Sequence, residues 1–268
     1  MHKAGPPPLE SAQLDRINWS LRGLDNLSVR RRHPPCPPIT LAMLRALKAT
    51  IQLSDPFNAC VWAMAACAFF GMMRFGEVSV SARTAFKPDK HITRGMAIFG
   101  TDMKGAPYAC LDLPVAKTAK PGEVQSVFLN EQDDLCPLAA LHNMAARSPA
   151  TAIEPLFSWL DKTGTARLMV KAQALDRINT ILLAWGWGTQ FRHSFRIGGT
   201  SFYLARKVDP EIVRLAGRWK SLTYQVYIRA FKQVASQHLA NKASIDDRAG
   251  PSQVGLTAAG QPQRASIG

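Results

Sequence analysis

An apolar stretch of fifteen residues, residues 59–73, constrains the fold more than any other part of the sequence. It is too short to cross a bilayer, which takes about 20 apolar residues, and Arg74 follows it directly. Asp55 and Pro56 precede it as a helix cap and a first-turn proline. A helix that is apolar on every side must be buried on every side. The sequence therefore predicts a central buried helix from Pro56 to about Met73.

Apolar residues at helical spacing predict further helices around this segment. Thr40 occupies the N-cap position of the helix that precedes it, and Gly186 is expected to end a later one. The ranges expected to be helical are residues 16–32, 40–52, 134–146, 168–185, 193–206, 210–217 and 221–240.

Residues 85–130 interrupt this helical pattern with three short β-prone runs, at 96–99, 108–115 and 123–129. Lys120-Pro121-Gly122 marks a turn between the last two runs. They predict a three-stranded antiparallel sheet at the edge of a helical domain. The expected fold class is therefore α+β, mainly α-helical, with one small sheet.

The boundaries of the chain's parts follow from composition. Four prolines within residues 34–38 predict an extended linker. Residues 1–38 are then an N-terminal segment too small to be a complete domain, and residues 39–240 form the main folded domain. Residues 241–268 are rich in Gly, Ser, Ala, Pro and Gln, which predicts a disordered tail.

The chain carries 33 Lys and Arg against 19 Asp and Glu, a formal net charge of +14. Residues 192–232 hold nine cationic and two acidic side chains, which is half of this excess. These cations alternate with apolar residues at helical spacing, whereas a membrane tether is usually a continuous basic tract. The charge therefore favours a nucleic-acid partner.

Cysteine and histidine usage indicates neither disulfides nor a metal. The five cysteines, at positions 36, 60, 67, 110 and 136, have no paired spacing, which is typical of a reduced, intracellular protein, nuclear if the source is eukaryotic. No Cys or His pair has metal-ligand spacing, and no Gly-rich phosphate loop is present. The sequence predicts no metal and no cofactor.

Cleavage of a DNA strand without a metal requires cations around the phosphate, a nucleophile, and an acid for the leaving oxygen. Guanidinium groups suit the first task because their paired N–H groups match two phosphate oxygens. Suitable residues occur in a definite order: Arg74 and Glu77 after the apolar helix, Lys117-Thr118 at a strand end, His193 and Arg196 opening a helix, Gly217-Arg218-Trp219, and Tyr227-Ile228-Arg229 in a late helix. Each motif is weak alone, and the order gives it weight.

This ordered set resembles the catalytic residues of the tyrosine recombinase (phage integrase) family, over roughly residues 40–240. The motifs Lys117-Thr118, His193-Ser-Phe-Arg196 and Gly217-Arg-Trp219-Lys-Ser are also similar to those of recombinases from fungal mobile elements. The resemblance implies a tyrosine-recombinase-like catalytic domain that cleaves and rejoins DNA at specific sites through a 3′-phosphotyrosyl bond, without ATP or metal.

The resemblance also implies a role for each residue. Arg74 and Arg196 would hold the non-bridging oxygens of the scissile phosphate. Lys117 would protonate the leaving 5′ oxygen. His193 would assist proton transfer at the tyrosine, and Tyr227 would attack phosphorus.

Two positions leave alternatives open. Glu77 would either hold the region of Arg74 in place or act as a carboxylate at a helix N-terminus. The family places His or Trp shortly after a glycine, and here both Arg218 and Trp219 follow Gly217. Trp219 is preferred, because an indole packs well and donates one hydrogen bond; Arg218 would add a third cation.

Similar choices concern the lysine and the tyrosine. Lys117 is preferred to Lys120, because Lys120 stands in the predicted turn. Tyr227 is preferred to Tyr224 because of the Tyr-Ile-Arg context. Sequence-independent attraction to the DNA backbone is assigned to Arg206, Lys207, Arg214, Lys220 and Arg229.

The resemblance implies double-stranded DNA as the partner, and a homotetramer on DNA held by the helix after Tyr227; no membrane or small-molecule substrate is expected. Residues 1–38 are interpreted as a remnant of the N-terminal core-binding helical domain of the family. Two other functions are weighed beside strand exchange. They are a DNA-binding remnant without catalysis and a type IB-like topoisomerase; a generic basic helical protein is a further, weaker alternative.

Overall fold

The structure is a computed structural model, and it describes residues 36–115, 124–190 and 192–219, with four isolated residues before them. The chain divides into two compact units, residues 1–36 and 37–268. In the first unit Gln13, Arg16, Ile17 and Ser20 are helical, and most of the helix expected over residues 16–32 lies outside the described residues. The predicted domain limits at residues 38 and 240 stay predictions.

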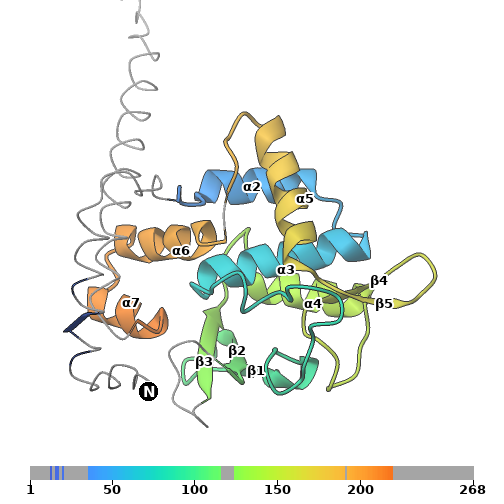
Figure 1. The fold of residues 1–268 in the computed structure, drawn as a ribbon, viewed down its shortest axis with the longest axis horizontal. Coiled ribbons are helices and arrows are strands. Elements are labelled where there is room, and N and C mark those ends of the chain that lie inside the picture. The colour runs from blue at the N-terminus through green and yellow to red at the C-terminus, as the bar shows by residue number, and fades with distance from the viewer. Residues whose placement is uncertain are drawn as a thin grey trace, which may run out of the picture. The chain divides into compact units, whose positions relative to one another are not determined.

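In the described part of the second unit, helices contain more residues than strands do (Figure 1). The six α-helices of its described part are α2 (Leu41–Thr50), α3 (Pro56–Phe70), α4 (Pro137–Arg147), α5 (Lys171–Ala184), α6 (Ser194–Ala205) and α7 (Pro210–Ala216). The 3-10 turn η2 (Arg94–Met96) leads into strand β1 (Ala97–Thr101). The other strands of the described part are β2 (Pro107–Leu113), β3 (Gln125–Asn130), β4 (Ser158–Leu160) and β5 (Ala166–Leu168). Among these residues no helix is both long and apolar enough to cross a membrane.

Helix α3 lies at the centre of this unit, as predicted. The Asp55 carboxylate accepts the Asn58 backbone N–H at 2.8 Å, and Pro56 occupies the first turn. Every residue from Ala59 to Phe70 is buried, and α3 contacts α2, α4, α5, α6, β3 and β4. The helix ends at Phe70, three residues before the predicted end, because the chain turns at Gly71 and Met72, where φ of Met72 is +45°.

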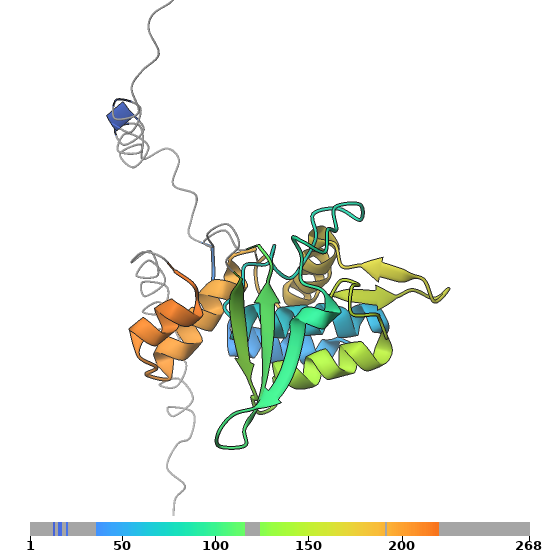
Figure 2. The same cartoon turned by 90° about the horizontal axis from the view of Figure 1, so that it is seen from below.

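The predicted three-stranded antiparallel sheet is confirmed, with the order β1-β2-β3. Leu111 and Leu113 of β2 and Val127 and Leu129 of β3 are buried, while the alternate residues of β3 are exposed or half-buried. The sheet therefore covers the helices with one face (Figure 2). The turn expected at residues 120–122 lies outside the described residues.

The helix predicted over residues 168–185 starts later than expected, at Lys171. Residues 166–168 instead form β5, which pairs antiparallel with β4 in a hairpin that the sequence analysis missed. The Asp161 carboxylate holds the turn by accepting the backbone N–H groups of Thr163 and Thr165, at 2.9 and 3.0 Å. Strands of three residues are too short to show an alternating pattern.

Two neighbouring glycines of α6 let its backbone lie directly against two other segments, Ile39 before α2 and Phe69 at the end of α3. A side chain on Gly198 would collide with the carbonyl oxygen of Ile39, and one on Gly199 with that of Phe69. The Ile39 N–H also donates to the Ser194 carbonyl at 3.0 Å. This close approach holds the first turn of α6 against the end of α3.

Replacement of Gly199 by Ala is expected to lower the free energy of unfolding by about 3 kcal/mol, because the new methyl group overlaps the Phe69 carbonyl. Urea denaturation followed by circular dichroism measures the change. Gly188→Ala is the matched control, since a Cβ there meets no atom within 4 Å; it should stay within about 0.5 kcal/mol of the unsubstituted chain. Equal stability of the two variants would contradict the close approach.

Candidate functional site

Arg74 lies in the turn that follows α3, and Glu77 fixes its direction. The Arg74 guanidinium donates to Glu77 Oε1 at 2.9 Å, and the Arg74 backbone N–H donates to Glu77 Oε2 at 2.8 Å. The Glu77 N–H returns a bond of 2.7 Å to the Arg74 carbonyl. Glu77 therefore stands in a turn and not at a helix N-terminus.

Arg196 extends from the first turn of α6 into the interior and is 2% exposed. Its guanidinium donates to the Met72 carbonyl at 2.6 Å and to the Gly217 carbonyl. The Trp219 ring covers it, with 4.0 Å between the guanidinium carbon and the ring centroid, a cation–π contact. Arg196 thus contacts the turn after α3 and the turn after α7.

Core packing places the segments of Arg74 and Arg196 side by side although they are far apart in the sequence. Their neighbours Phe75 and Phe195 are fully buried, with ring centroids 5.2 Å apart. The Phe75 N–H also donates to the Arg192 carbonyl at 3.4 Å. The two arginines consequently approach the same corner of the molecule from α3 and α6.

Arg218 enters this corner from the turn after α7. Its φ is +59°, a left-handed conformation that costs a non-glycine residue about 1 kcal/mol. Its side chain is 5% exposed and donates to Glu77 Oε2 at 2.6 Å. Burial lowers the pKa of the Arg218 guanidinium below its usual value; the Glu77 carboxylate opposes this shift and the Arg74 charge adds to it.

Trp219 combines packing with the contact to Arg196. It is 8% exposed and packs against Met72 and Val213, and its ring lies so close to Gly217 that a side chain there would have no room. The structure brings both candidates for the His/Trp position, Arg218 and Trp219, to the site, where they contact different partners. Trp219 meets Arg196 and Arg218 meets Glu77, and the preference for Trp219 at the His/Trp position stays a prediction.

His193 is the residue that caps α6, and it is half-buried. It follows Arg192, whose carbonyl meets Phe75, so it lies beside the turn that carries Arg74. Lys117, Lys120, Tyr224 and Tyr227 lie outside the described residues, and their placement stays a prediction.

The residues assigned to backbone attraction differ in position. Arg206 and Lys207 are exposed at the end of α6, with Arg206 over the Phe202 ring at 4.5 Å. Arg214 is half-buried on α7; it pairs with Glu211 and donates to the Trp219 carbonyl at 2.8 Å. Lys220 and Arg229 lie outside the described residues.

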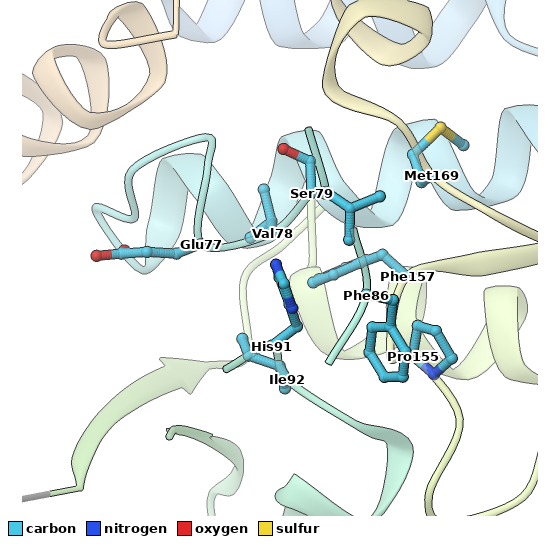
Figure 3. Close-up of a pocket in the computed structure, with 10 residues that line it drawn as sticks. Glu77, Val78, Ser79, Phe86, His91, Ile92, Pro155, Phe157 and Met169 are labelled. Atoms are coloured by element: carbon cyan, nitrogen blue, oxygen red, sulfur yellow. The ribbon is translucent and has the colours of Figure 1, made fainter. Parts of the chain in front are cut away.

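A small cavity of about 20 Å³ borders Glu77 on the side opposite its carboxylate, which points away from the other labelled residues (Figure 3). Its lining is mainly apolar, with Val78, Phe86 and Phe157, and has His91 at one side. A space of this size holds about one water molecule and no organic ligand. Within residues 36–115, 124–190 and 192–219 no three His, Cys, Asp or Glu side chains are grouped to hold a metal ion.

The fold is similar to that of a solved site-specific recombinase. The XerH site-specific recombinase, in its pre-cleavage complex with the difH substrate, aligns with a TM-score of 0.50 and 15% identity over 88% of this chain. The Tn1549 transposon integrase bound to transposon right end DNA gives 0.46 and 12% over 87%, and an FLP recombinase–Holliday junction complex gives 0.42 and 11% over 83%.

This chain spans 66% of the XerH chain, 80% of the Tn1549 integrase chain and 55% of the FLP chain. No protein-family model and no curated protein sequence matches it. At 15% identity the likeness to XerH establishes the fold alone.

Tyr203 is half-buried against the core, and its hydroxyl group donates to the Phe70 carbonyl at 2.8 Å. Burial raises the pKa of Tyr203 to about 12. The unfolded chain would therefore ionise at lower pH than the folded one, so stability should fall as the pH rises from about 10 to 12.

Tyr203→Phe should lose about 1 kcal/mol at neutral pH through the missing hydrogen bond. It should also weaken the alkaline fall in stability. Urea denaturation at pH 8, 10 and 11.5 measures both effects. An unchanged alkaline fall in the variant would contradict this assignment.

Replacement of Trp219 tests its packing. Trp219→Ala should lower the free energy of unfolding by about 3 kcal/mol, because it opens a space between Met72 and Val213 and uncovers Arg196. Trp219→Phe keeps an aromatic face on the guanidinium and should lose less than half as much. Guanidinium chloride denaturation compares the two, and equal losses would contradict the ring contact.

Proposed function

We propose that this chain cleaves and rejoins double-stranded DNA at specific sites through a covalent 3′-phosphotyrosyl intermediate. The observation that carries the proposal is that the segments of Arg74 and Arg196 lie side by side: Arg196 donates to the Met72 carbonyl, and Phe75 packs on Phe195. The combined positive charge of the two arginines suits a phosphate whose negative charge grows during the reaction.

The chemistry follows the roles that the resemblance implies. The Tyr227 hydroxyl oxygen attacks phosphorus and loses its proton with the help of His193. The bond from phosphorus to the 5′ oxygen breaks, and Lys117 supplies the proton to that oxygen. Attack by a 5′ hydroxyl of another strand reverses these steps, so the bond energy is conserved and no external energy source is needed.

Burial of Arg196 adds a condition to this mechanism. Its guanidinium meets two carbonyl groups and an indole ring, and it is 2% exposed. A phosphate reaches it only if the Trp219 ring moves aside. We therefore expect DNA binding to displace this ring while Arg218 stays with Glu77.

The DNA partner and the assembly belong to the same proposal. Exposed Arg206 and Lys207 would attract the DNA backbone without reading its sequence. A homotetramer on DNA, joined by the helix after Tyr227, would bring two duplexes together for exchange. Movement of a mobile element is the reaction class that the sequence resemblance favours.

A DNA-binding chain without catalysis is the second candidate. The burial of Arg196 favours it, because a phosphate gains no charge stabilisation from a guanidinium that stays covered. The two candidates differ in one product, the covalent protein–DNA adduct.

Adduct trapping on a pool of nicked duplexes of randomised sequence separates these functions. A nick beside the scissile phosphate lets the short product diffuse away, so the adduct accumulates and resists boiling in detergent. The unsubstituted chain should form it. Tyr227→Phe should reduce it to background while DNA binding, measured by gel shift, stays within about twofold, because only the nucleophilic oxygen is lost.

Tyr224→Phe is the matched control and should keep the adduct. An adduct formed by Tyr227→Phe would overturn the choice of nucleophile. Binding without any adduct in the unsubstituted chain would establish the second candidate, and a chain that binds no DNA would refute both.

A further inference from the structure

The Glu77 carboxylate is shared by two guanidinium groups. Oε1 accepts from Arg74 at 2.9 Å, and Oε2 accepts from Arg218 at 2.6 Å. The exposed fractions of the side chains are 22% for Arg74, 5% for Arg218 and 9% for Glu77. Of the two cations, Arg74 is therefore the one that a ligand can reach, and Arg218 is the deeper partner.

A carboxylate in this position is an obstacle to phosphate binding. A phosphate that approaches Arg74 meets the negative charge of Glu77 within hydrogen-bonding distance of the same guanidinium. Charges in a buried site are weakly screened, so this repulsion is stronger than on an open surface. If Arg74 were the only cation paired with Glu77, the carboxylate and the phosphate would compete for the Arg74 guanidinium.

We propose that Arg218 is a positioning residue that neutralises Glu77 and thereby leaves the charge of Arg74 for a DNA phosphate. This inference rests on the proposed function and goes beyond it, because the sequence offered Arg218 only for the His/Trp position or as a third cation on the phosphate. Glu77 then orients Arg74 through the backbone N–H while Arg218 balances its charge.

The backbone around Arg218 supports this role. Gly217 ends α7, and the left-handed turn at Arg218 directs the side chain inward to Glu77. The next residue, Trp219, covers Arg196. One short turn therefore reaches the surroundings of both arginines. Its Arg218 binds Glu77, the partner of Arg74, and its Trp219 covers Arg196.

A double-substitution experiment tests the charge balance. In Arg218→Met, Glu77 keeps Arg74, so the initial rate of adduct formation on nicked DNA should fall on the order of 100-fold. The double variant Glu77→Gln with Arg218→Met removes both charges and should recover to within about tenfold of the unsubstituted rate. Rescue by a second loss is not expected of a residue that only supports the fold.

A binding measurement gives a second readout that needs no catalysis. The slope of log affinity against log salt counts phosphate contacts, with about 0.9 for each. Arg218→Met should lower this slope by about one unit, because Arg74 stays with Glu77. The double variant should regain it.

Two further variants serve as controls. Arg167→Met removes another arginine from a carboxylate, Asp161, in the β4–β5 hairpin, and should leave the rate and the slope unchanged. Arg218→Lys keeps a cation near Glu77 and should lose about tenfold or less in rate, since lysine lacks the paired N–H groups. It also keeps the test available if Arg218→Met does not fold.

The outcomes separate this inference from the proposed function. A double variant as impaired as Arg218→Met, in rate and in slope, would overturn the inference and place Arg218 on the phosphate or in the fold alone, while the proposed function stands. An unchanged slope and rate in Arg218→Met would also overturn it. An unsubstituted chain that binds no DNA would overturn both.

Discussion

The burial of α3 from Ala59 to Phe70 is the constraint on which the rest of the structure depends. A helix that is apolar on every side has no face to offer to water, so other elements must cover it all round. Helices α2, α4, α5 and α6 and strands β3 and β4 do so. The chain turns after the end of α3, and Arg74 lies in this turn beside Glu77.

Core packing also positions the second arginine. The two glycines of α6 let its backbone lie directly against Ile39 and Phe69, and the Phe75–Phe195 pair fixes the adjoining turns. This packing places the Arg196 guanidinium where it donates a hydrogen bond to the Met72 carbonyl. Apolar contacts one or two residues away therefore determine where Arg74 and Arg196 lie. Substitutions at these core positions are expected to displace the two arginines.

Buried charge is the cost of this arrangement, and the site offsets it with specific partners. Arg196, Arg218 and Glu77 are 9% exposed or less, whereas the Arg74 side chain is 22% exposed. Isolated buried ions are strongly unfavourable. Here Glu77 serves Arg74 and Arg218, and carbonyl groups and an indole ring serve Arg196. These partners stabilise the buried charges in the folded chain.

The sequence by itself determined the central helix, the three-stranded sheet and the segments that carry Arg74 and Arg196, because apolar periodicity and caps such as Asp55 are local signals. It did not reveal the β4–β5 hairpin, whose strands are too short for a pattern. The pairing of Glu77 with Arg218, and of Trp219 with Arg196, came only from the tertiary structure. These contacts join segments that are far apart in the sequence. They also depend on the left-handed conformation of Arg218, which no local sequence pattern predicts for a non-glycine residue.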